Sequence, residues 1–535
     1  MKFRRTSGGA ILAGVSALLI ASVFEAQPVL TAGAAAASCE SLASLALPNA
    51  TITKAETVAP GAFTPPAAAP GAGRGGAQGR GAAGGRGGAT PVYATLPSFC
   101  RIAATLKPSS DSEIKVEVWL PSSGWNGKFQ AVGNGGWAGS ISYPAMAAAV
   151  AAGYATASTD TGHAGNSAAF ALGHPEKLVD MGYRAIHETA VHGKAVVGAF
   201  YGSPAAVSMF NGCSTGGRQG VTEAARYPAD FDGIIAGASA IYNARLSGSR
   251  IAINQFVNRT GGSAIAPEKL PAVHAAVLNA CDATDGVKDG VIENPEACRF
   301  DPKVLECKGV DAPSCLTSEQ VETARALYAP VKHPTTGAHV LHSLLQPGSE
   351  LGWATLAGSE PLGNAQEPFK YIVFKDPGWD WRRFNAATDI DLAVKADNNV
   401  MSLTDPNLKP YFDRGGKLLM YHGWSDPQVT AMNSVTYFTD VLKTTGKAAQ
   451  GKSIQLYMVP GMLHCQGGPG TDVFDKVAAM ERWISTGRAP DHIIASHVTS
   501  GVVDRTRPLC PYGQVAKWKG TGSTEEAANF SCVAR

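Results

Sequence analysis

The sequence predicts an α/β fold, in which a sheet of parallel strands is covered by helices and interrupted by a large insertion. Strand and helix patterns alternate between residues 114 and 237, and strand patterns return at 417–421 and 454–459. Such alternation builds parallel sheets with helices on their faces. Of the 535 residues, 45% are hydrophobic and 16% are charged, which provides a large core and argues against an intrinsically disordered chain.

The N-terminus is typical of an export signal. Basic residues at positions 2, 4 and 5 precede an apolar run over 10–24, and small residues follow at 34–38. The run is shorter than the about 20 apolar residues that a membrane span needs. We therefore predict a signal peptide over 1–37, a secreted or periplasmic protein and no membrane span. The paired arginines leave a twin-arginine export route open.

Residues 59–90 form a stretch of low complexity in which almost every residue is Gly, Ala, Pro or Arg. The stretch has too few large apolar side chains to fold, so we predict a flexible linker there. Its Arg-Gly-Gly repeats also occur in RNA-binding proteins, but the export signal and the charge balance disfavour nucleic acid as a partner. Residues 91–535 carry 38 basic and 40 acidic side chains, which gives no general positive charge to bind phosphates.

Periodicity orders the elements of the sheet along the chain. Residues 114–120 alternate between apolar and polar side chains and predict a half-buried strand. Within 183–201, apolar residues recur every three or four positions, as on one face of an amphipathic helix. Other patterns predict a helix that ends near 227 and strands at 128–132, 205–210, 233–237, 417–421 and 454–459.

The alternation lapses between 241 and 400, where Pro, Gly and four cysteines are frequent. We predict that 38–240 and 401–535 are two parts of one catalytic domain and that 241–400 form an inserted lid. Six aromatic side chains fall close together in this lid. They either form its own core or cover a bound aromatic group by stacking: Phe369, Tyr371, Phe374, Trp379, Trp381 and Phe384.

A nucleophile motif lies between a predicted strand and a predicted helix. Residues 212–216 read Gly-Cys-Ser-Thr-Gly, which matches the G-x-S-x-G elbow of the α/β-hydrolase fold. In that turn the backbone is strained, and the hydroxyl of the serine, here Ser214, stands above the sheet. The sequence therefore predicts an α/β-hydrolase fold with Ser214 as nucleophile.

A serine hydroxyl needs a histidine to accept its proton and an acid to orient that histidine. In this fold they follow the serine in the order acid, then histidine. Asp426 lies five residues beyond the strand at 417–421, and His464 lies five residues beyond the strand at 454–459. Both positions are at the carboxyl ends of strands, where sites of α/β proteins form. We assign no catalytic role to His422, His163 or Asp160, which lie on nearby loops.

Ten cysteines in an exported protein indicate disulfides. Proximity in the sequence suggests that Cys281 pairs with Cys298, Cys307 with Cys315 and Cys510 with Cys532. A bridge from Cys39 to Cys100 would enclose the low-complexity linker. A bridge from Cys213 to Cys465 would tie the nucleophile turn to the histidine loop and restrain the distance between nucleophile and base.

With these residues the sequence resembles the tannase and feruloyl esterase family, whose motif pairs Cys-Ser, Asp and His-Cys. The match is to Cys213 and Ser214, to Asp426, and to His464 and Cys465. The resemblance extends through 133–137, 160–163 and 507–512, and it covers the mature chain except 59–90.

The resemblance implies a serine carboxylic ester hydrolase that acts on esters of aromatic or phenolic acids, including those attached to plant polysaccharide. Ser214 attacks, His464 is the base, Asp426 orients it, and an acyl-enzyme forms. The oxyanion needs backbone donors, one of them the amide that follows the nucleophile, at Thr215. For the second donor the resemblance indicates Gly136, with Gly135 as a near alternative. We expect no organic cofactor.

Three alternatives remain open at this point. The same triad serves terephthalate-monoester hydrolases, and it also serves acyltransferases and peptidases. A protein of a different class, a secreted binding module that depends on calcium and lacks catalysis, is the third.

A run of carboxylates at 281–291 suggests a calcium site, because hard oxygen ligands on a tight loop suit that ion. The spacing differs from that of an EF-hand, and composition alone fits a solvated turn equally well. The resemblance implies structural Ca²⁺ in the lid, held by the side chains of Asp282, Asp285 and Asp289 and by the carbonyls of Val287 and Val291.

Overall fold

A computed structural model describes residues 37–66 and 92–535. The predicted signal peptide, apart from its last residue, and residues 67–90 of the predicted linker lie outside the described residues. The main sheet has nine strands. In chain order they are β1 (Ala50–Val58), β2 (Phe99–Leu106), β3 (Ile114–Pro121), β4 (Lys128–Val132), β6 (Ala155–Thr159), β8 (Val207–Cys213), β9 (Gly233–Gly237), β12 (Lys417–Gly423) and β13 (Ile454–Val459).

The strands lie in the order β1-β2-β3-β6-β4-β8-β9-β12-β13. From β6 to β13 all neighbours are parallel, as the alternating pattern predicts, and the α/β class is confirmed. The pairs β1–β2, β2–β3 and β3–β6 are antiparallel. The connection between β2 and β3 spans only 107–113, which favours an antiparallel pair there because a parallel pair needs a long crossover.

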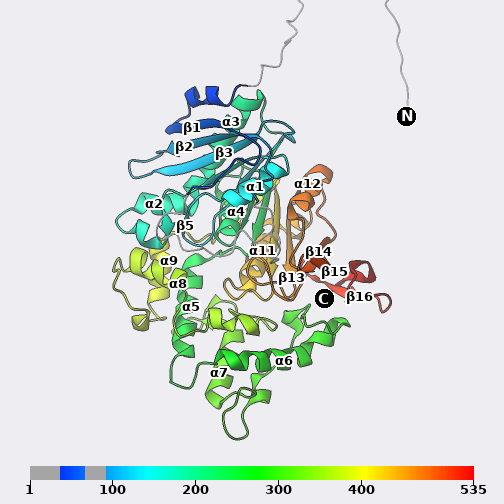
Figure 1. Ribbon diagram of the computed structural model, residues 1–535. Coiled ribbons are helices and arrows are strands. Elements are labelled where there is room, and N and C mark those ends of the chain that lie inside the picture. Colours follow the sequence, from blue (N-terminus) through cyan, green and yellow to red (C-terminus); the bar gives the residue numbers. More distant parts are fainter. Residues whose placement is uncertain (1–36, 67–91) are drawn as a thin grey trace, which may run out of the picture. The chain divides into compact units, whose positions relative to one another are not determined.

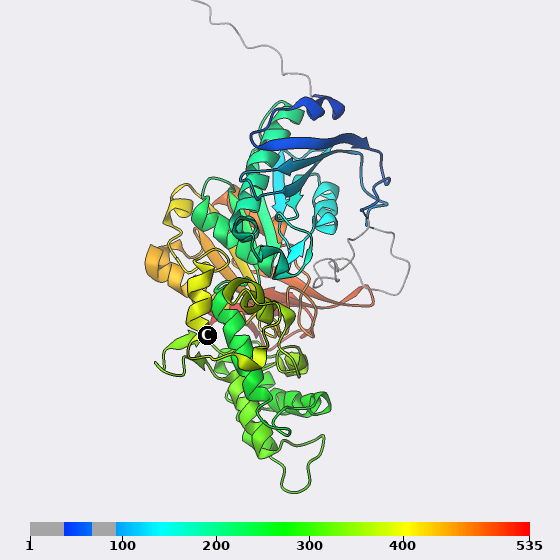
Figure 2. The same ribbon diagram turned by 90° about the vertical axis from the view of Figure 1, so that its left-hand side faces the viewer.

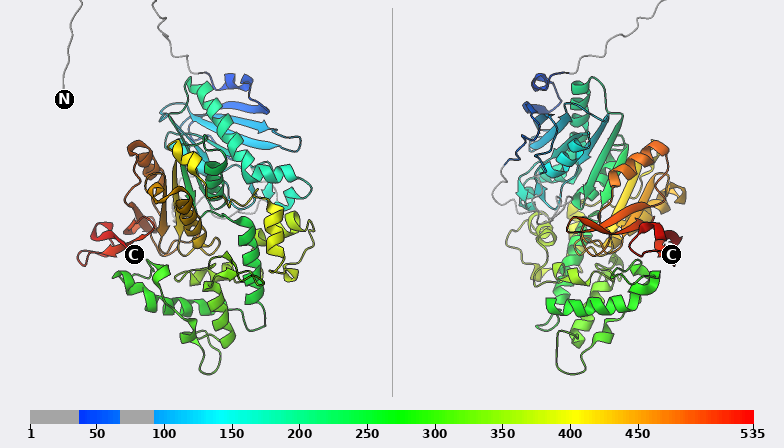
Figure 3. Two further views of the ribbon diagram at one scale, coloured as in Figure 1. Left: turned by 180° about the vertical axis from the view of Figure 1, so that it is seen from behind. Right: turned by 45° about the vertical axis from the view of Figure 1, so that its right-hand side comes forward.

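Helices cover both faces of the sheet. One face is covered by α3 (Ala185–Tyr201), α4 (Thr215–Arg226) and α11 (Ala431–Thr445), and the other by α1 (Tyr143–Ala151) and α12 (Lys476–Thr486). Phe210 and Ile234 pack in the core of the first face, whereas their neighbours Met209 and Ile235 pack with Trp483 of α12. In Figure 1 α1 and α12 lie in front of the sheet, and Figure 3 (left) shows α3 from behind.

The strand predicted at 114–120 forms as β3, but the half-buried pattern is wrong. Glu117, whose polar side chain suggests a solvent-facing position, is 4% exposed. Its carboxylate pairs with Arg101 at 2.6 Å and accepts hydrogen bonds from Trp119 at 2.8 Å and from the Tyr143 hydroxyl at 2.9 Å. The buried acid is tolerated because several donors satisfy it.

The N-terminal end of the low-complexity stretch is part of the core. Phe63 is 6% exposed and its ring lies 4.4 Å from that of Trp119. The prediction of a linker from residue 59 is therefore wrong for its first residues, because one aromatic side chain anchors them against the sheet.

Most of the insertion between β9 and β12 is helical or irregular. It contains α5 (Asn243–Val257), α6 (Leu270–Cys281), α7 (Ser318–Tyr328), β10 (Val331–Lys332), β11 (His339–Leu341), α8 (Gly363–Glu367) and α9 (Asp389–Asp397). Figures 1 and 2 show these helices gathered at one end of the sheet, with α5 leading into them. Two hydrophobic clusters form the interior of this segment, which we call the lid as predicted above.

The six lid aromatics pack in two different hydrophobic clusters. Phe369, Trp379, Trp381 and Phe384 are buried together in one lid cluster, and Phe374 packs against it. Tyr371 packs against a different cluster that includes Trp137. Of the two roles open for them in the sequence, the lid's own core accounts for five of the six.

All ten cysteines form disulfides. The pairs are Cys39–Cys100, Cys213–Cys465, Cys281–Cys298, Cys307–Cys315 and Cys510–Cys532, which are the pairs that the sequence suggests. The remaining elements are β5 (Ala138–Gly139), β7 (Gly165–Asn166), α2 (Pro175–Val179), α10 (Lys409–Asp413), β14 (Ile493–Thr499), β15 (Val502–Leu509), β16 (Gln514–Trp518) and β17 (Phe530–Ala534). Within the described residues, no helix combines the length and apolar content that a membrane span requires.

Candidate active site

Ser214 occupies the turn between β8 and α4. Its backbone has φ 64° and ψ −121°, a conformation that costs free energy for a residue with a side chain. The turn is stabilised by the Ser214 amide, which donates to the carbonyl of Gly237 at 2.9 Å. A Cβ on Gly212 would lie 2.5 Å from the carbonyl carbon of Gly216, so the flanking glycines allow strand and helix to approach this closely.

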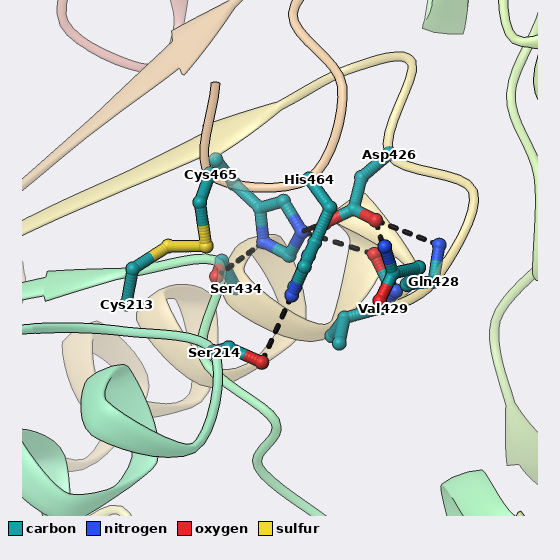
Figure 4. Close-up of a disulfide and its surroundings, with 9 residues drawn as sticks. Cys213, Ser214, Asp426, Gln428, Val429, Ser434, His464 and Cys465 are labelled. Carbon is teal, nitrogen blue, oxygen red and sulfur yellow. Dashed lines mark hydrogen bonds and ion pairs between the residues drawn. A yellow bond between two sulfur atoms is a disulfide. The ribbon is translucent and has the colours of Figure 1, made fainter. Parts of the chain in front are cut away.

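The structure brings the serine, histidine and aspartate predicted from the sequence together. Nε2 of His464 lies 2.9 Å from Oγ of Ser214, and Nδ1 of the same ring lies 2.6 Å from Oδ2 of Asp426 (Figure 4). The serine follows β8, the aspartate follows β12 and the histidine follows β13. Parallel strands of one sheet thus place three groups that are distant in sequence at one end of the sheet.

Asp426 is completely buried. Its Oδ1 accepts the amides of Gln428 at 2.8 Å and Val429 at 3.0 Å. Burial opposes ionisation, but the charge of His464 and hydrogen bonds from His464 and His422 outweigh it, so the pKa of Asp426 lies well below its ordinary value. The carboxylate is therefore ionised throughout the neutral pH range.

His422, to which the sequence assigns no catalytic role, contacts the buried carboxylate of Asp426. Its ring is fully buried, and Nε2 lies 3.1 Å from Oδ2 of Asp426 and 3.0 Å from the carbonyl of Val429. Both neighbours are acceptors, so Nε2 carries a proton and donates. Nδ1 lies 2.8 Å from the Ser434 hydroxyl. The sequence signal for this contact is the position of His422 in β12, four residues before the aspartate.

The Cys213–Cys465 disulfide links the residue before the serine to the residue after the histidine (Figure 4). The two Cα atoms lie 6.1 Å apart across a sequence separation of 252 residues. Cys465 has φ 66°, a left-handed conformation that is uncommon for a residue with a side chain. The covalent link holds both loops in register and so restrains the distance between the hydroxyl and the imidazole.

The two residues predicted to supply the oxyanion donors lie beside Ser214. Thr215 is the first residue of α4, so its amide has no acceptor within the helix. Its hydroxyl donates to the carbonyl of Gly136 at 3.0 Å. This bond holds the glycine-rich loop at 133–137 against the nucleophile turn at 212–216. Gly136 has φ 55°, and both Gly135 and Gly136 line the same pocket as Ser214.

The loop at 160–163 packs against the glycine-rich loop at 133–137. His163 is buried, its Nε2 donates to the carbonyl of Trp137 at 2.8 Å, and its ring stacks on Phe170. Burial raises the pKa of Asp160 to about 6, although its Oδ1 accepts the amides of Lys115 and Gly162 at 2.9 Å. Neither side chain lines the pocket that contains Ser214.

A pocket of about 320 Å³ opens above Ser214 and His464. One wall is formed by the catalytic domain, with Trp137 and Asn166. The opposite wall comes from the lid, where Leu362 and α8 contribute. None of the six lid aromatics named above lines this pocket. The volume suits a small organic group rather than a polymer.

The predicted calcium loop is folded around its own carboxylates. Asp282 accepts the amides of Asp289 at 3.3 Å and Gly290 at 3.1 Å. A cavity of about 20 Å³ is lined by Asp285, Asp289 and Val291 and by a further acid, Glu293, but by neither Asp282 nor Val287. Arg507 donates to Asp289 at 2.7 Å.

Two acids of this cavity are held in an unfavourable environment. Burial, followed by the charges of Asp289 and Asp282, raises the pKa of Asp285 to about 6. Burial raises the pKa of Glu293 to about 8, and nearby acids contribute. Arg505 and Arg507 line the same cavity, so a hard cation there would have carboxylate oxygens as ligands beside two positive side chains.

A serine on a strained turn between a parallel strand and a helix, with a histidine and a buried aspartate at the ends of two later strands, is the arrangement of serine hydrolases with the α/β-hydrolase fold. The tannase and feruloyl esterase family model matches residues 100–533. The chain belongs to this family and is a carboxylic ester hydrolase.

Individual relatives agree with this assignment. An uncharacterized esterase of Xanthomonas campestris pv. campestris is 36% identical, covering 94% of this chain and 92% of its own. A probable feruloyl esterase B-1 of Aspergillus oryzae is 32% identical over 83% of this chain and 85% of its own. The crystal structure of feruloyl esterase B from Aspergillus oryzae superposes with a TM-score of 0.83 at 29% identity, covering 93% of this chain and 99% of that chain.

A tannin acyl hydrolase from Aspergillus niger has the same fold. It superposes with a TM-score of 0.73 at 21% identity, covering 92% of this chain and 93% of that chain.

Proposed function

We propose that this chain is a secreted serine esterase of feruloyl esterase or tannase type that cleaves esters of small aromatic or phenolic acids through an acyl-enzyme. The observation that carries the proposal is the hydrogen-bonded series from Ser214 through His464 to the buried Asp426, at the floor of a pocket between catalytic domain and lid. The names of the relatives support the acyl class.

The proposed mechanism uses each contact of this hydrogen-bonded series. Oγ of Ser214 attacks the ester carbonyl carbon while Nε2 of His464 accepts its proton, and Asp426 stabilises the imidazolium that forms. The amides of Thr215 and Gly136 bind the negative oxygen of the tetrahedral intermediate. The imidazolium then gives its proton to the leaving alcohol. Water, deprotonated by His464, attacks the acyl-enzyme and releases the acid and Ser214.

The substrate is a small aromatic ester, whether free or attached to plant polysaccharide. A pocket of about 320 Å³ accommodates one substituted ring, and Trp137 and Leu362 supply apolar surface for it. The part of the alcohol beyond the ester oxygen would remain outside the pocket, so a large alcohol group is compatible with this site.

A panel of methyl ferulate, methyl gallate and a terephthalate monoester tests the function. We expect turnover of at least one of the phenolic esters, followed by release of the acid. Preferred turnover of the monoester would identify a terephthalate-monoester hydrolase, and transfer to an added alcohol would identify an acyltransferase. Tight binding without turnover of any of them, and without labelling by an organophosphonate, would contradict the proposal and favour a binding module.

The disulfides support export of the protein from the cytoplasm. Five disulfides stabilise the described chain, and disulfides persist in oxidising compartments. Together with the predicted signal over residues 1–37, they support a secreted or periplasmic location. Proteomic detection of a mature N-terminus near residue 38 outside the cytoplasm would verify it.

We also propose a structural Ca²⁺ in the lid loop at 281–291. Asp282, Asp285 and Asp289 would hold it with the carbonyls of Val287 and Val291. The support is that three of these residues, Asp285, Asp289 and Val291, line one small cavity, and that burial and nearby carboxylates raise the pKa of Asp285, a repulsion that a cation would offset. The ion would join the loop to the disulfide-linked end of α6 and would take no part in ester cleavage.

Removal of the ion should lower the thermal stability of the protein. A ligand that binds only the folded state contributes to stability, so we expect a strong chelator to lower Tm by about 5 °C or more. Without chelator, Asp285→Asn should already have the Tm of the chelated wild type, and chelator should not lower it further. Asp491→Asn, at an exposed position, should respond to chelator as wild type does. Metal analysis must first show that the chelated protein is free of calcium. If its melting curve is then unchanged, the proposed site is contradicted.

A further inference from the structure

The charge of the active-site pocket is set by one side chain of the lid. Among the residues that line the pocket, Glu367 is the only acid, and His464 is the only side chain that can carry a positive charge. Apart from the hydroxyl of Ser214, the remaining polar side chains are neutral amides, those of Asn166, Asn364 and Gln428. A substrate therefore meets amide groups and one carboxylate above the nucleophile.

Glu367 is fixed in position. It ends α8, and its Oε2 accepts the amide of Ala168 from the catalytic domain at 2.9 Å. Within the part of the chain that the structure describes, no Lys, Arg or His lies within 4.0 Å of this carboxylate. Its negative charge is thus not neutralised by an ion pair.

A buried cation lies beside two residues of the pocket. Arg250 of α5 is 4% exposed, and its guanidinium donates to Oδ1 of Asn364 at 3.3 Å and to the carbonyl of Gln428. Both of these residues line the pocket, so they separate the guanidinium from a bound substrate. The positive charge of Arg250 is also opposed by the buried Asp426.

We propose that Glu367 makes this enzyme select against esters that carry a free carboxylate, and so makes it an esterase for neutral, hydroxyl-bearing aromatic substrates. This inference rests on the proposed function. An anionic group that enters the pocket loses solvation and is repelled by the carboxylate. A phenolic or sugar hydroxyl can instead donate a charge-assisted hydrogen bond to it.

Two esters of the same ring and the same alcohol compare a neutral with an anionic substrate, and the two equivalent ester groups of the diester account for only a factor of two in rate. Dimethyl terephthalate is neutral, and monomethyl terephthalate is an anion at pH 7. We expect wild-type kcat/KM to be at least about tenfold higher for the diester, because two like charges in a partly desolvated site repel each other. Added salt at about 0.5 M should reduce this preference through screening.

Glu367→Gln tests the residue itself, since the amide oxygen can still accept the hydrogen bond from Ala168. We expect the ratio of kcat/KM for monoester over diester to rise about tenfold and to lose its dependence on salt, with Tm unchanged. Glu367→Asp, which keeps the charge, should retain the wild-type preference in direction. The control Glu268→Gln, at an exposed lid position, should leave the ratio at the wild-type value.

The outcomes separate the two proposals. If wild type hydrolyses neutral esters but the ratio is the same in Glu367→Gln, the role of Glu367 is overturned and the esterase function stands. A wild-type preference for the monoester would overturn the inference in the same way. If wild type hydrolyses no neutral methyl ester, methyl ferulate included, the proposed function fails and the inference with it.

Discussion

Ser214→Ala is expected to lower kcat/KM for methyl ferulate by about 10⁶-fold, because no other group near His464 can form the acyl-enzyme. The hydroxyl makes its contact with Nε2 of His464 and lies on the pocket side of the turn. Alanine removes only that hydroxyl, so Tm should change little. The measurement is initial-rate hydrolysis with purified variants, together with labelling by a fluorescent organophosphonate, which should mark wild type alone.

Ser203→Ala is the matched control, since Ser203 is exposed in the turn that precedes β8. It should keep wild-type rates and labelling. Substantial turnover by Ser214→Ala, or labelling of a different residue on peptide mapping, would refute Ser214 as nucleophile.

Asp426→Asn is expected to lower kcat/KM by about 10⁴-fold with little loss of structure. The amide oxygen of asparagine can still accept the backbone amides of Gln428 and Val429. Its amino group cannot accept from Nδ1 of His464, so the imidazole turns or takes the other tautomer and no longer accepts the serine proton. We would measure kcat/KM for methyl ferulate and the melting temperature on the same preparations.

The exposed Asp405 supplies the control for this change, and Asp405→Asn should be within twofold of wild type. Activity of Asp426→Asn within tenfold of wild type would show that another group orients His464. A large loss of Tm would mean that the buried carboxylate acts mainly in folding, and the two readouts distinguish these cases.

The candidate site could be predicted from the sequence because its three side chains occupy positions with local signals. Ser214 lies in a short glycine-rich motif, and Asp426 and His464 each follow an apolar strand segment by a fixed short interval. Parallel strands bring their carboxyl ends to one edge, so the intervals alone place these residues near one another. The same logic placed six strands of the sheet and both helices that flank the nucleophile strand.

Other features of the site could not be read in this way. The sequence places His422 on a loop just after the strand at 417–421, whereas it is part of β12, and its position four residues before the aspartate does not by itself show that its ring donates to a buried carboxylate. Glu117 alternates like a solvent-facing residue, yet it is buried because Arg101, Trp119 and Tyr143 meet it. In both cases the deciding partner is supplied by another residue whose position depends on the fold.

The sequence by itself determined the class of the fold, the order of its strands along the chain and the nucleophile motif, and proximity suggested three of the five pairs of cysteines. These depend on local periodicity, turn chemistry and short spacings. Only the tertiary structure decided that the aromatic residues of the lid serve mainly its own core, and that α8 places Glu367 in the pocket. The physical reason is that burial and the charge of a pocket arise from contacts between segments far apart in the chain, and periodicity within one segment carries no information about them.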